Sequence, residues 1–241
     1  MTRLFKREDL EQFLLERWSQ QQITADRDLP RSALNAVLEQ AAAAFTSALR
    51  CSHAKAAADL GAKLAAAYSL PAADVYCAGI AHDLCKELVS ADQQVLARVC
   101  PIPCPPEVLS NHRFTHGPAA AALLFRTGLC TDLRILQAVA WHTVGSPEMD
   151  TLALLVFCAD KIEPGRGGFS EELRAAWLSG AFPGEAGLLQ LAGTILDRIT
   201  AHCRIEGHPI ADTTPVLYNA LQQRLQHLTG TAGRPSKALP Q

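Results

Sequence analysis

Apolar positions recur every three or four residues along almost the whole chain, and runs that alternate residue by residue are nearly absent. This spacing is typical of amphipathic α-helices and not of strands. The sequence therefore predicts an all-α protein. Helices are expected over about 7–21, 31–50, 53–69, 72–88, 91–99, 116–128, 131–142, 150–163, 170–178, 185–205 and 214–228.

Short segments with proline or glycine separate the predicted helices, but none is long enough to link two domains. We expect one helical domain over residues 31–228. A helical extension (1–30) precedes it and a disordered tail (229–241) follows it. Leu10, Phe13, Leu14 and Trp18 share one side of the helix in the extension, and we interpret this side as packing on the domain. A homodimer contact or a partner-binding surface are the alternatives.

Charge and composition exclude several classes of protein. With 22 Lys and Arg against 24 Asp and Glu, the chain lacks the positive charge on which many nucleic-acid binders rely. Its uncharged stretches are too short to span a membrane. The first residues become acidic before a signal-peptide core can form, so we expect a soluble, cytoplasmic protein. Eight cysteines are scattered without a framework spacing and are expected to be reduced.

Two aspartates follow apolar stretches. Asp83 comes directly after His82 at the end of an apolar stripe, and Asp160 follows the uncharged run 152–159. A buried carboxylate without a partner costs several kcal/mol, so each needs a cation. Lys161 is expected to point about 100° away from Asp160 on an ideal helix. A metal ion or a distant arginine then remain as the partners of Asp160.

Three more histidines, His53, His116 and His142, lie on apolar helix faces. One inward histidine is more often a hydrogen-bonded core residue than a metal ligand. A larger set changes this balance, because six donors can bind two ions, and mixed nitrogen and oxygen donors suit manganese, iron, cobalt, nickel or zinc better than magnesium or calcium. The candidate ligands, drawn from five predicted helices, are His53, His82, Asp83, His116, His142 and Asp160.

These residues carry a resemblance. His53, the segment 81–86 (AHDLCK) and Asp160 resemble HD-domain metallophosphohydrolases. Segments 115–120 (THGPAA), 141–149 (WHTVGSPEM) and 159–166 (ADKIEPGR) resemble the YqeK-type branch in particular, as do residues 208–210 with Thr214 and residues 218–219. The resemblance covers residues 32–228. It implies an HD-domain helical bundle that cleaves diadenosine tetraphosphate symmetrically into two ADP.

The resemblance also implies roles for the candidate residues. His53, His82, Asp83 and Asp160 would hold one metal ion, and Asp83 would bridge to a second ion held by His116 and His142. Iron is the metal expected for this branch, with manganese, cobalt, nickel or zinc as alternatives. A metal-activated water would attack the tetraphosphate, so Asp83 and Lys86 are the expected catalytic residues.

Four residues are candidates for substrate binding. Lys86 is placed one turn beyond His82, and Arg166 lies in a glycine-flanked loop after Asp160, so both side chains could reach phosphate oxygens. Either could instead be a solvated surface charge. Thr143 and Gly145 are expected to shape the pocket, although a simple helix end explains them equally well.

Other functions stay open at this point. An HD phosphohydrolase acting on a nucleoside monophosphate, a deoxynucleoside triphosphate or a cyclic dinucleotide would use the same ligands, because the pocket walls select the substrate. A non-catalytic helical interaction module is a third interpretation. The chain has no Walker-type, Gly-x-Gly-x-x-Gly or Gly-x-Ser-x-Gly motif, which disfavours a kinase, a Rossmann enzyme and a serine hydrolase.

Overall fold

The computed structural model describes residues 4–24, 30–208 and 210–230, so most of the predicted tail lies outside the described residues. Within this part the chain is all-α, as the sequence predicted, and one isolated bridge pairs Phe5 with Leu88. No helix of the described part is long and apolar enough to cross a membrane. The helices are α1 (Arg7–Thr24), α2 (Arg31–Phe45), α3 (Ala48–Leu64), α4 (Ala72–Ala81), α5 (Ser90–Ala97), α6 (Pro106–Ser110), α7 (His116–Arg126), α8 (Leu133–Trp141), α9 (Thr151–Ile162), α10 (Phe169–Leu178), α11 (Gly184–Glu206) and α12 (Thr213–Thr229), with a 3₁₀ turn over Ala65–Tyr68.

Helix boundaries differ from the sequence prediction in two places that matter for the site. The helix predicted over 31–50 ends at Phe45, and Ser47 then begins α3 by accepting a hydrogen bond from the Arg50 amide. The helix predicted over 72–88 ends at Ala81, and turns follow it. Within these turns, the Leu84 amide donates to the Ala81 carbonyl and the Lys86 amide donates to the Asp83 carbonyl. Phe5 of the extension then pairs with the end of this segment, because its amide donates to the Glu87 carbonyl and its carbonyl accepts from the Val89 amide.

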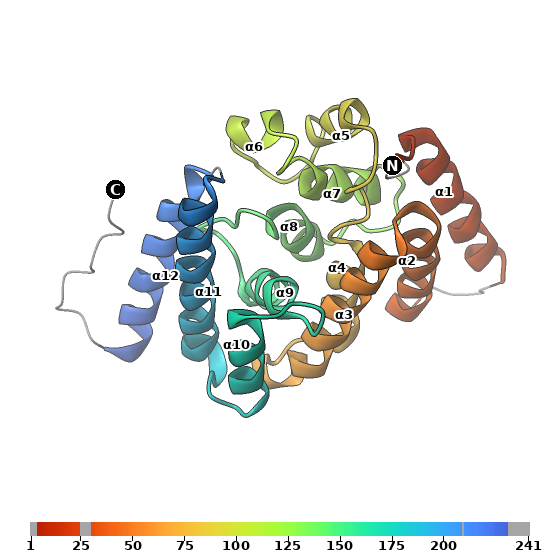
Figure 1. Cartoon of the computed structure of the whole chain (residues 1–241). Helices are drawn as coiled ribbons and strands as arrows, with labels where there is room; N and C mark the ends of the chain where they lie inside the picture. Colours follow the sequence, from red (N-terminus) through yellow and green to blue (C-terminus); the bar gives the residue numbers. More distant parts are fainter. Residues whose placement is uncertain (1–3, 25–29, 209, 231–241) are drawn as a thin grey trace.

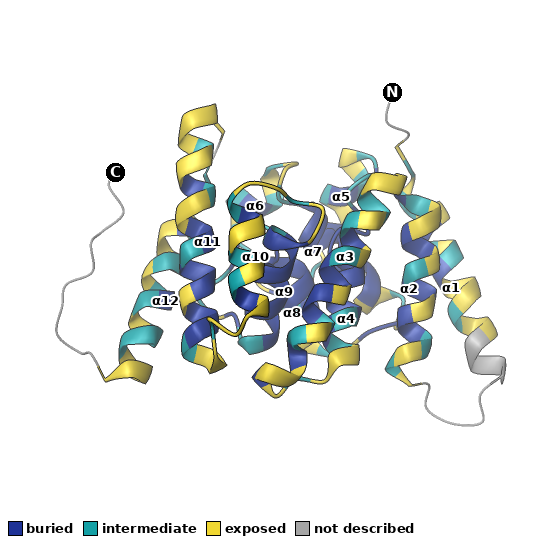
Figure 2. Ribbon diagram, turned by 60° about the horizontal axis from the view of Figure 1, so that its bottom comes forward, coloured by how far each residue is buried: buried dark blue, intermediate teal, exposed yellow. Residues whose placement is uncertain are grey.

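The core forms around α9, which lies in the middle of the molecule between α3 and α11 (Figure 1). Residues 152–160 are all buried (Figure 2), so this helix is surrounded by protein on nearly every side. A helix that is surrounded in this way needs no polar face, which explains its uncharged run. Asp160 near its end is therefore a carboxylate inside the core.

The extension packs on α2 through α1. Leu10 and Leu14 are fully buried, and Phe13 contacts Phe45 edge to face with a ring separation of 5.3 Å. These contacts place the apolar side of α1 against the rest of the chain. All eight cysteines are free thiols.

Close packing of α3 against α4 leads to a stability prediction. A Cβ added at Gly79 would lie 2.6 Å from the Cα of Ala58, so the two backbones would have to separate. We expect Gly79→Ala to lower the free energy of unfolding by about 2 kcal/mol, measured by urea denaturation. Gly193→Ala is the matched control, because its nearest neighbour is the flexible end of Gln222 at 3.3 Å. The control should leave stability unchanged or raise it, and equal losses in both variants would contradict the prediction.

Candidate metal centre

The structure brings all six predicted donors into one buried cluster. Three overlapping groups of three residues each place their ligand atoms within 4.8 Å of one another. Five of the six residues are buried, and the His53 side chain is 10% exposed. The groups are His53, His82 and Asp83; His82, His142 and Asp160; and Asp83, His116 and His142.

Asp83 divides its two oxygens between two pairs of histidines. Its Oδ1 lies 3.2 Å from His116 Nε2 and 3.6 Å from His142 Nε2. Its Oδ2 lies 3.6 Å from His53 Nε2 and 3.5 Å from His82 Nε2. Each carboxylate oxygen therefore faces its own pair of imidazoles, which is the arrangement that a carboxylate needs to bridge two ions.

Asp160 completes the side of the cluster that holds His53 and His82. Its Oδ1 lies 3.0 Å from His53 Nε2 and 3.7 Å from His82 Nε2. The two sides are thus unequal, with four donors around His53 and His82 and three around His116 and His142 when Asp83 is counted on both.

Helix ends orient two of the imidazoles. His82 and His142 are the C-caps of α4 and α8, where backbone carbonyls of the last turn lack helical partners. His82 Nδ1 lies 2.6 Å from the Gly79 carbonyl, and His142 Nδ1 lies 2.8 Å from the Val139 carbonyl. Each carbonyl requires the proton on Nδ1, so the Nε2 lone pair points into the cluster. The sequence prediction placed His82 inside a longer helix, where the Gly79 carbonyl would instead accept a hydrogen bond from the backbone amide of Asp83.

Glu163, which sequence reasoning missed, orients His53. Its Oε1 lies 3.1 Å from His53 Nδ1, and the residue is only 3% exposed. Arg174 fixes this segment by donating to the carbonyls of Ile162 and Glu163. A carboxylate behind a ligating histidine is a recurrent feature of metal sites.

Basic side chains surround the two aspartates. Arg50 Nη1 lies 2.6 Å from Asp83 Oδ2, and Lys161 Nζ lies 2.6 Å from Asp160 Oδ2. The expectation that Lys161 points away from Asp160 was wrong, because its long side chain folds back to the neighbouring carboxylate and to the His142 carbonyl. Arg166 also binds Asp160, with Nη2 3.0 Å from Oδ1.

These contacts set the charge states of the cluster. Burial alone would raise the pKa of Asp83, but the neighbouring His82, His116 and His142 hold it well below its usual range. Burial likewise opposes ionisation of Asp160, and Lys161 and His53 lower its pKa. Burial lowers the pKa of His116 to about 3 and that of His142 to about 4. Two carboxylates and two neutral imidazoles are therefore ready to act as donors near pH 7.

Lys86 also reaches the cluster, from the turn that follows α4 and not from a helical face. Its Nζ lies 3.2 Å from His116 Nδ1, and burial lowers its pKa. Thr143 lies beside the same histidines, with Oγ1 3.1 Å from His116 Nε2 and 2.9 Å from His142 Nε2.

Gly145 lies in the turn after α8, where its amide donates to the Trp141 carbonyl. Its φ of +78° favours glycine, and a Cβ there would collide with the Leu217 side chain of α12. Its place in the structure is thus a turn between α8 and α9 against which α12 packs.

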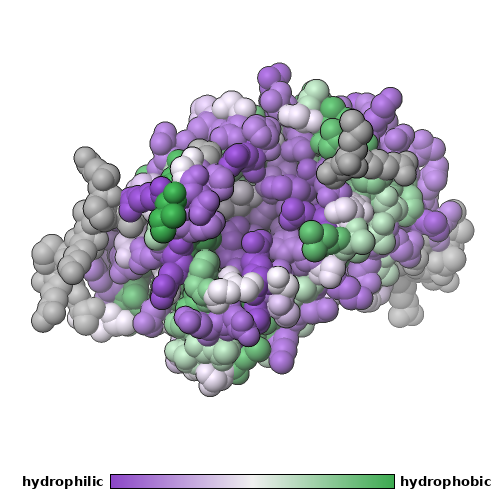
Figure 3. Space-filling model, in the orientation of Figure 1, coloured by the Kyte–Doolittle hydropathy of each residue, from purple (hydrophilic) through white to green (hydrophobic). Residues whose placement is uncertain are grey.

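The chemistry of the donor set fits transition-metal ions. Four imidazoles and two ionised carboxylates converge within one small volume, and His82, His142 and His53 are held by partners on their second nitrogen. Nitrogen donors favour ions such as manganese, iron or zinc over calcium. The face of the molecule in Figure 3 is hollowed near its centre, and the hollow is lined mainly by hydrophilic residues.

Comparisons with known proteins identify the domain that carries this cluster. Residues 50–165 match the HD domain family, and all six donors lie within that range. The structure also resembles the crystal structure of a predicted HD superfamily hydrolase involved in NAD metabolism from Clostridium acetobutylicum, with a TM-score of 0.66 at 21% identity over 92% of this chain and 100% of that one. Residues 50–165 therefore match an HD domain, and the fold around them is similar to that of an HD superfamily hydrolase, in agreement with the resemblance seen in the sequence.

Part of the sequence is also similar to two curated proteins of the same name. The symmetrical bis(5'-nucleosyl)-tetraphosphatase of Staphylococcus aureus is 32% identical over 118 residues, which is 48% of this chain and 60% of that protein. The protein of the same name from Bacillus subtilis is 32% identical over 123 residues, 50% of this chain and 57% of that one. The matches thus span less than two thirds of either relative.

The geometry of Asp83 predicts the metal content of its variants. We expect the protein, purified without oxygen and loaded with ferrous or manganous ion, to hold about two ions per chain. Asp83→Asn should reduce this to less than about one, because it removes the oxygen charge that both histidine pairs share. Plasma mass spectrometry measures the ratio. Asp59→Asn, an exposed change of equal charge on α3, should retain the full content, and full content in Asp83→Asn would refute the bridge.

Proposed function

We propose that this protein is a metal-dependent phosphohydrolase that cleaves diadenosine tetraphosphate symmetrically into two ADP. The observation that carries the proposal is the division of the Asp83 oxygens between the pair His116 and His142 and the pair His53 and His82. The names of the two curated relatives support the choice of substrate.

In this proposal His53, His82, Asp83 and Asp160 hold one ion, and Asp83, His116 and His142 hold the other. Two bound ions supply a water of lowered pKa and neutralise charge on the phosphoryl group that it attacks. The chain contributes the orientation of the donors. Gly79 and Val139 carbonyls and the Glu163 carboxylate hold three imidazoles with Nε2 directed inward.

Basic residues at the cluster suit a polyanionic substrate. Lys86 and Arg166 are proposed to bind phosphate oxygens, and Arg166 keeps 40% of its side chain exposed while it contacts Asp160. Lys86 is the proposed catalytic cation, since its ammonium lies beside His116 at the centre of the cluster. It would stabilise the charge that develops on the cleaved phosphates.

Thr143 and Gly145 are proposed to form the pocket in different ways. Thr143 directs its hydroxyl to His116 and His142 and thus lies at the edge of the reacting centre. Gly145 shapes the turn after α8, because only a residue without a side chain lets Leu217 of α12 pack against this turn.

A product assay tests the reaction. Incubation of diadenosine tetraphosphate with the metal-loaded protein should give ADP as the only nucleotide product, resolved by anion-exchange chromatography. AMP together with ATP would show asymmetric cleavage and would overturn the proposal. Turnover of a nucleoside monophosphate, a deoxynucleoside triphosphate or a cyclic dinucleotide without turnover of the tetraphosphate would establish another HD phosphohydrolase. A lack of turnover of every nucleotide would favour a non-catalytic module.

The role of Lys86 predicts a specific defect. Lys86→Met keeps the length of the side chain but removes its charge, so we expect kcat to fall about 10²-fold with two ions still bound. Steady-state kinetics and metal analysis together separate loss of the cation from loss of the metal site. Lys63→Met, an exposed change on α3, is the control and should retain normal kcat. A normal kcat in Lys86→Met would remove Lys86 from the catalytic machinery.

A further inference from the structure

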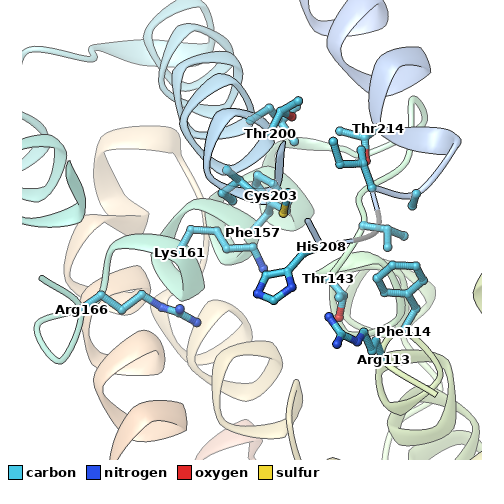
Figure 4. A pocket seen from close by; sticks show the side chains of 15 residues that line it. Arg113, Phe114, Thr143, Phe157, Lys161, Arg166, Thr200, Cys203, His208 and Thr214 are labelled. Carbon is cyan, nitrogen blue, oxygen red and sulfur yellow. The ribbon is translucent and has the colours of Figure 1, made fainter. Parts of the chain in front are cut away.

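A cavity of about 320 Å³ opens beside the metal centre (Figure 4). Thr143, Lys161 and Arg166 belong both to its lining and to the contacts of the His/Asp cluster. The cavity therefore adjoins the candidate metal centre through these three residues. Its size falls in the range of about 300–1,000 Å³ that is typical of small-molecule sites.

The cavity is cationic at the end next to the cluster. Lys161 and Arg166 both approach Asp160 there. Figure 4 shows both side chains entering from the same side of the cavity, opposite Arg113 and Phe114. A ligand in the cavity would therefore contact two basic side chains at the end that lies next to the metal centre.

The rest of the wall is mostly apolar and carries two aromatic rings. Phe157 of α9 and Phe114 contribute the rings, and Leu196 and Ile199 of α11 contribute aliphatic surface. His208 lies between these walls in the view of Figure 4 and offers a polar group to whatever enters. This end suits a flat, uncharged group that carries a few hydrogen-bonding atoms.

A second cavity at the site has a different character. It lies on the Lys86 side and is lined by Ser90, Gln93 and His112 among others, and none of the described residues that line it is a phenylalanine, tyrosine or tryptophan. Arg113 lines both cavities and is exposed, and its guanidinium makes no hydrogen bond or ion pair within the described residues. The aromatic cavity is thus the one that suits a heterocycle, and Arg113 lies between the two cavities without an ionic partner among the residues that the structure describes.

We propose that the aromatic cavity binds the nucleoside end of a nucleoside polyphosphate, with the base between its apolar walls and the first phosphates at Lys161, Arg166 and Arg113. This assignment rests on the proposed function and specifies which part of the chain recognises the nucleoside. A heterocycle with an anionic chain matches a cavity that is apolar at one end and cationic at the other, whereas an inorganic polyphosphate would leave the apolar end empty.

Cys203 provides a test that needs no turnover, because its partly exposed thiol also lines the cavity. The manganese-loaded protein is treated with iodoacetamide in the presence of ADP or of pyrophosphate, and alkylation is followed by peptide mass spectrometry. ADP should slow alkylation of Cys203 about tenfold, and pyrophosphate should have little effect. Cys100, which is partly exposed but does not line the cavity, is the internal control. Equal rates for Cys203 with ADP and with pyrophosphate would overturn the assignment.

A pair of substitutions on one helix gives an independent readout. Ile199→Trp fills the cavity, whereas Ile205→Trp makes the same change at a position that is 81% exposed on α11. Isothermal titration should show ADP binding weakened about tenfold by Ile199→Trp and pyrophosphate binding unchanged. Ile205→Trp should bind both ligands as the unmodified protein does. Loss of both ligands in a folded Ile199→Trp protein would place the phosphates, and not the nucleoside, in the cavity and would contradict the proposal.

These measurements separate the nucleoside site from the proposed reaction. If diadenosine tetraphosphate is not cleaved to ADP but ADP still protects Cys203, the proposed function fails and the nucleoside site stands. If ADP is the only product but neither Cys203 nor Ile199→Trp responds, the reaction stands and the cavity assignment fails.

Discussion

Two carboxylates in the interior of a helical protein are the constraint on which this structure depends. Asp83 and Asp160 are 4% and 3% exposed, and burying their charges without compensation would cost several kcal/mol each. Imidazoles and the cations Arg50, Lys161 and Arg166 supply that compensation. Four histidines also face these carboxylates with their Nε2 atoms, and this is the donor set that we propose for two divalent ions. The cluster therefore holds two buried carboxylates, and the basic side chains next to them are suited to binding phosphates.

Helix ends lower the cost of burying this cluster, because their backbone groups can form hydrogen bonds with the imidazoles. His82 and His142 cap α4 and α8, so their Nδ1 atoms can bond to the Gly79 and Val139 carbonyls, which a continuous helix would pair with its own amides. His116 is the first residue of α7. The extension contributes as well. Phe5 pairs with Glu87 and Val89 and holds the turn from which Lys86 reaches His116. A segment far from the cluster in sequence thus helps to position one of its cations.

Much of this could be predicted from the sequence, and the limits have physical causes. Helical spacing predicted the all-α fold, and the order of His53, His82, Asp83, His116, His142 and Asp160 predicted that these side chains meet. Their partners were harder to foresee. Arg50 and Glu163 sit next to motif residues in sequence, but only tertiary packing aims them at Asp83 and His53. Ideal helix geometry placed Lys161 away from Asp160, because it describes where a side chain starts and not where a long, flexible one ends. The segment after α4 pairs with the distant Phe5 at Glu87 and Val89, and no local pattern of residues predicts such a long-range contact.

The bridging position of Asp83 is tested most directly by anomalous X-ray diffraction from crystals grown with manganous ion. Two peaks about 4 Å apart, with one Asp83 oxygen bound to each, are the predicted result. A single peak, or Asp83 still paired with Arg50 and bound to no ion, would contradict the account.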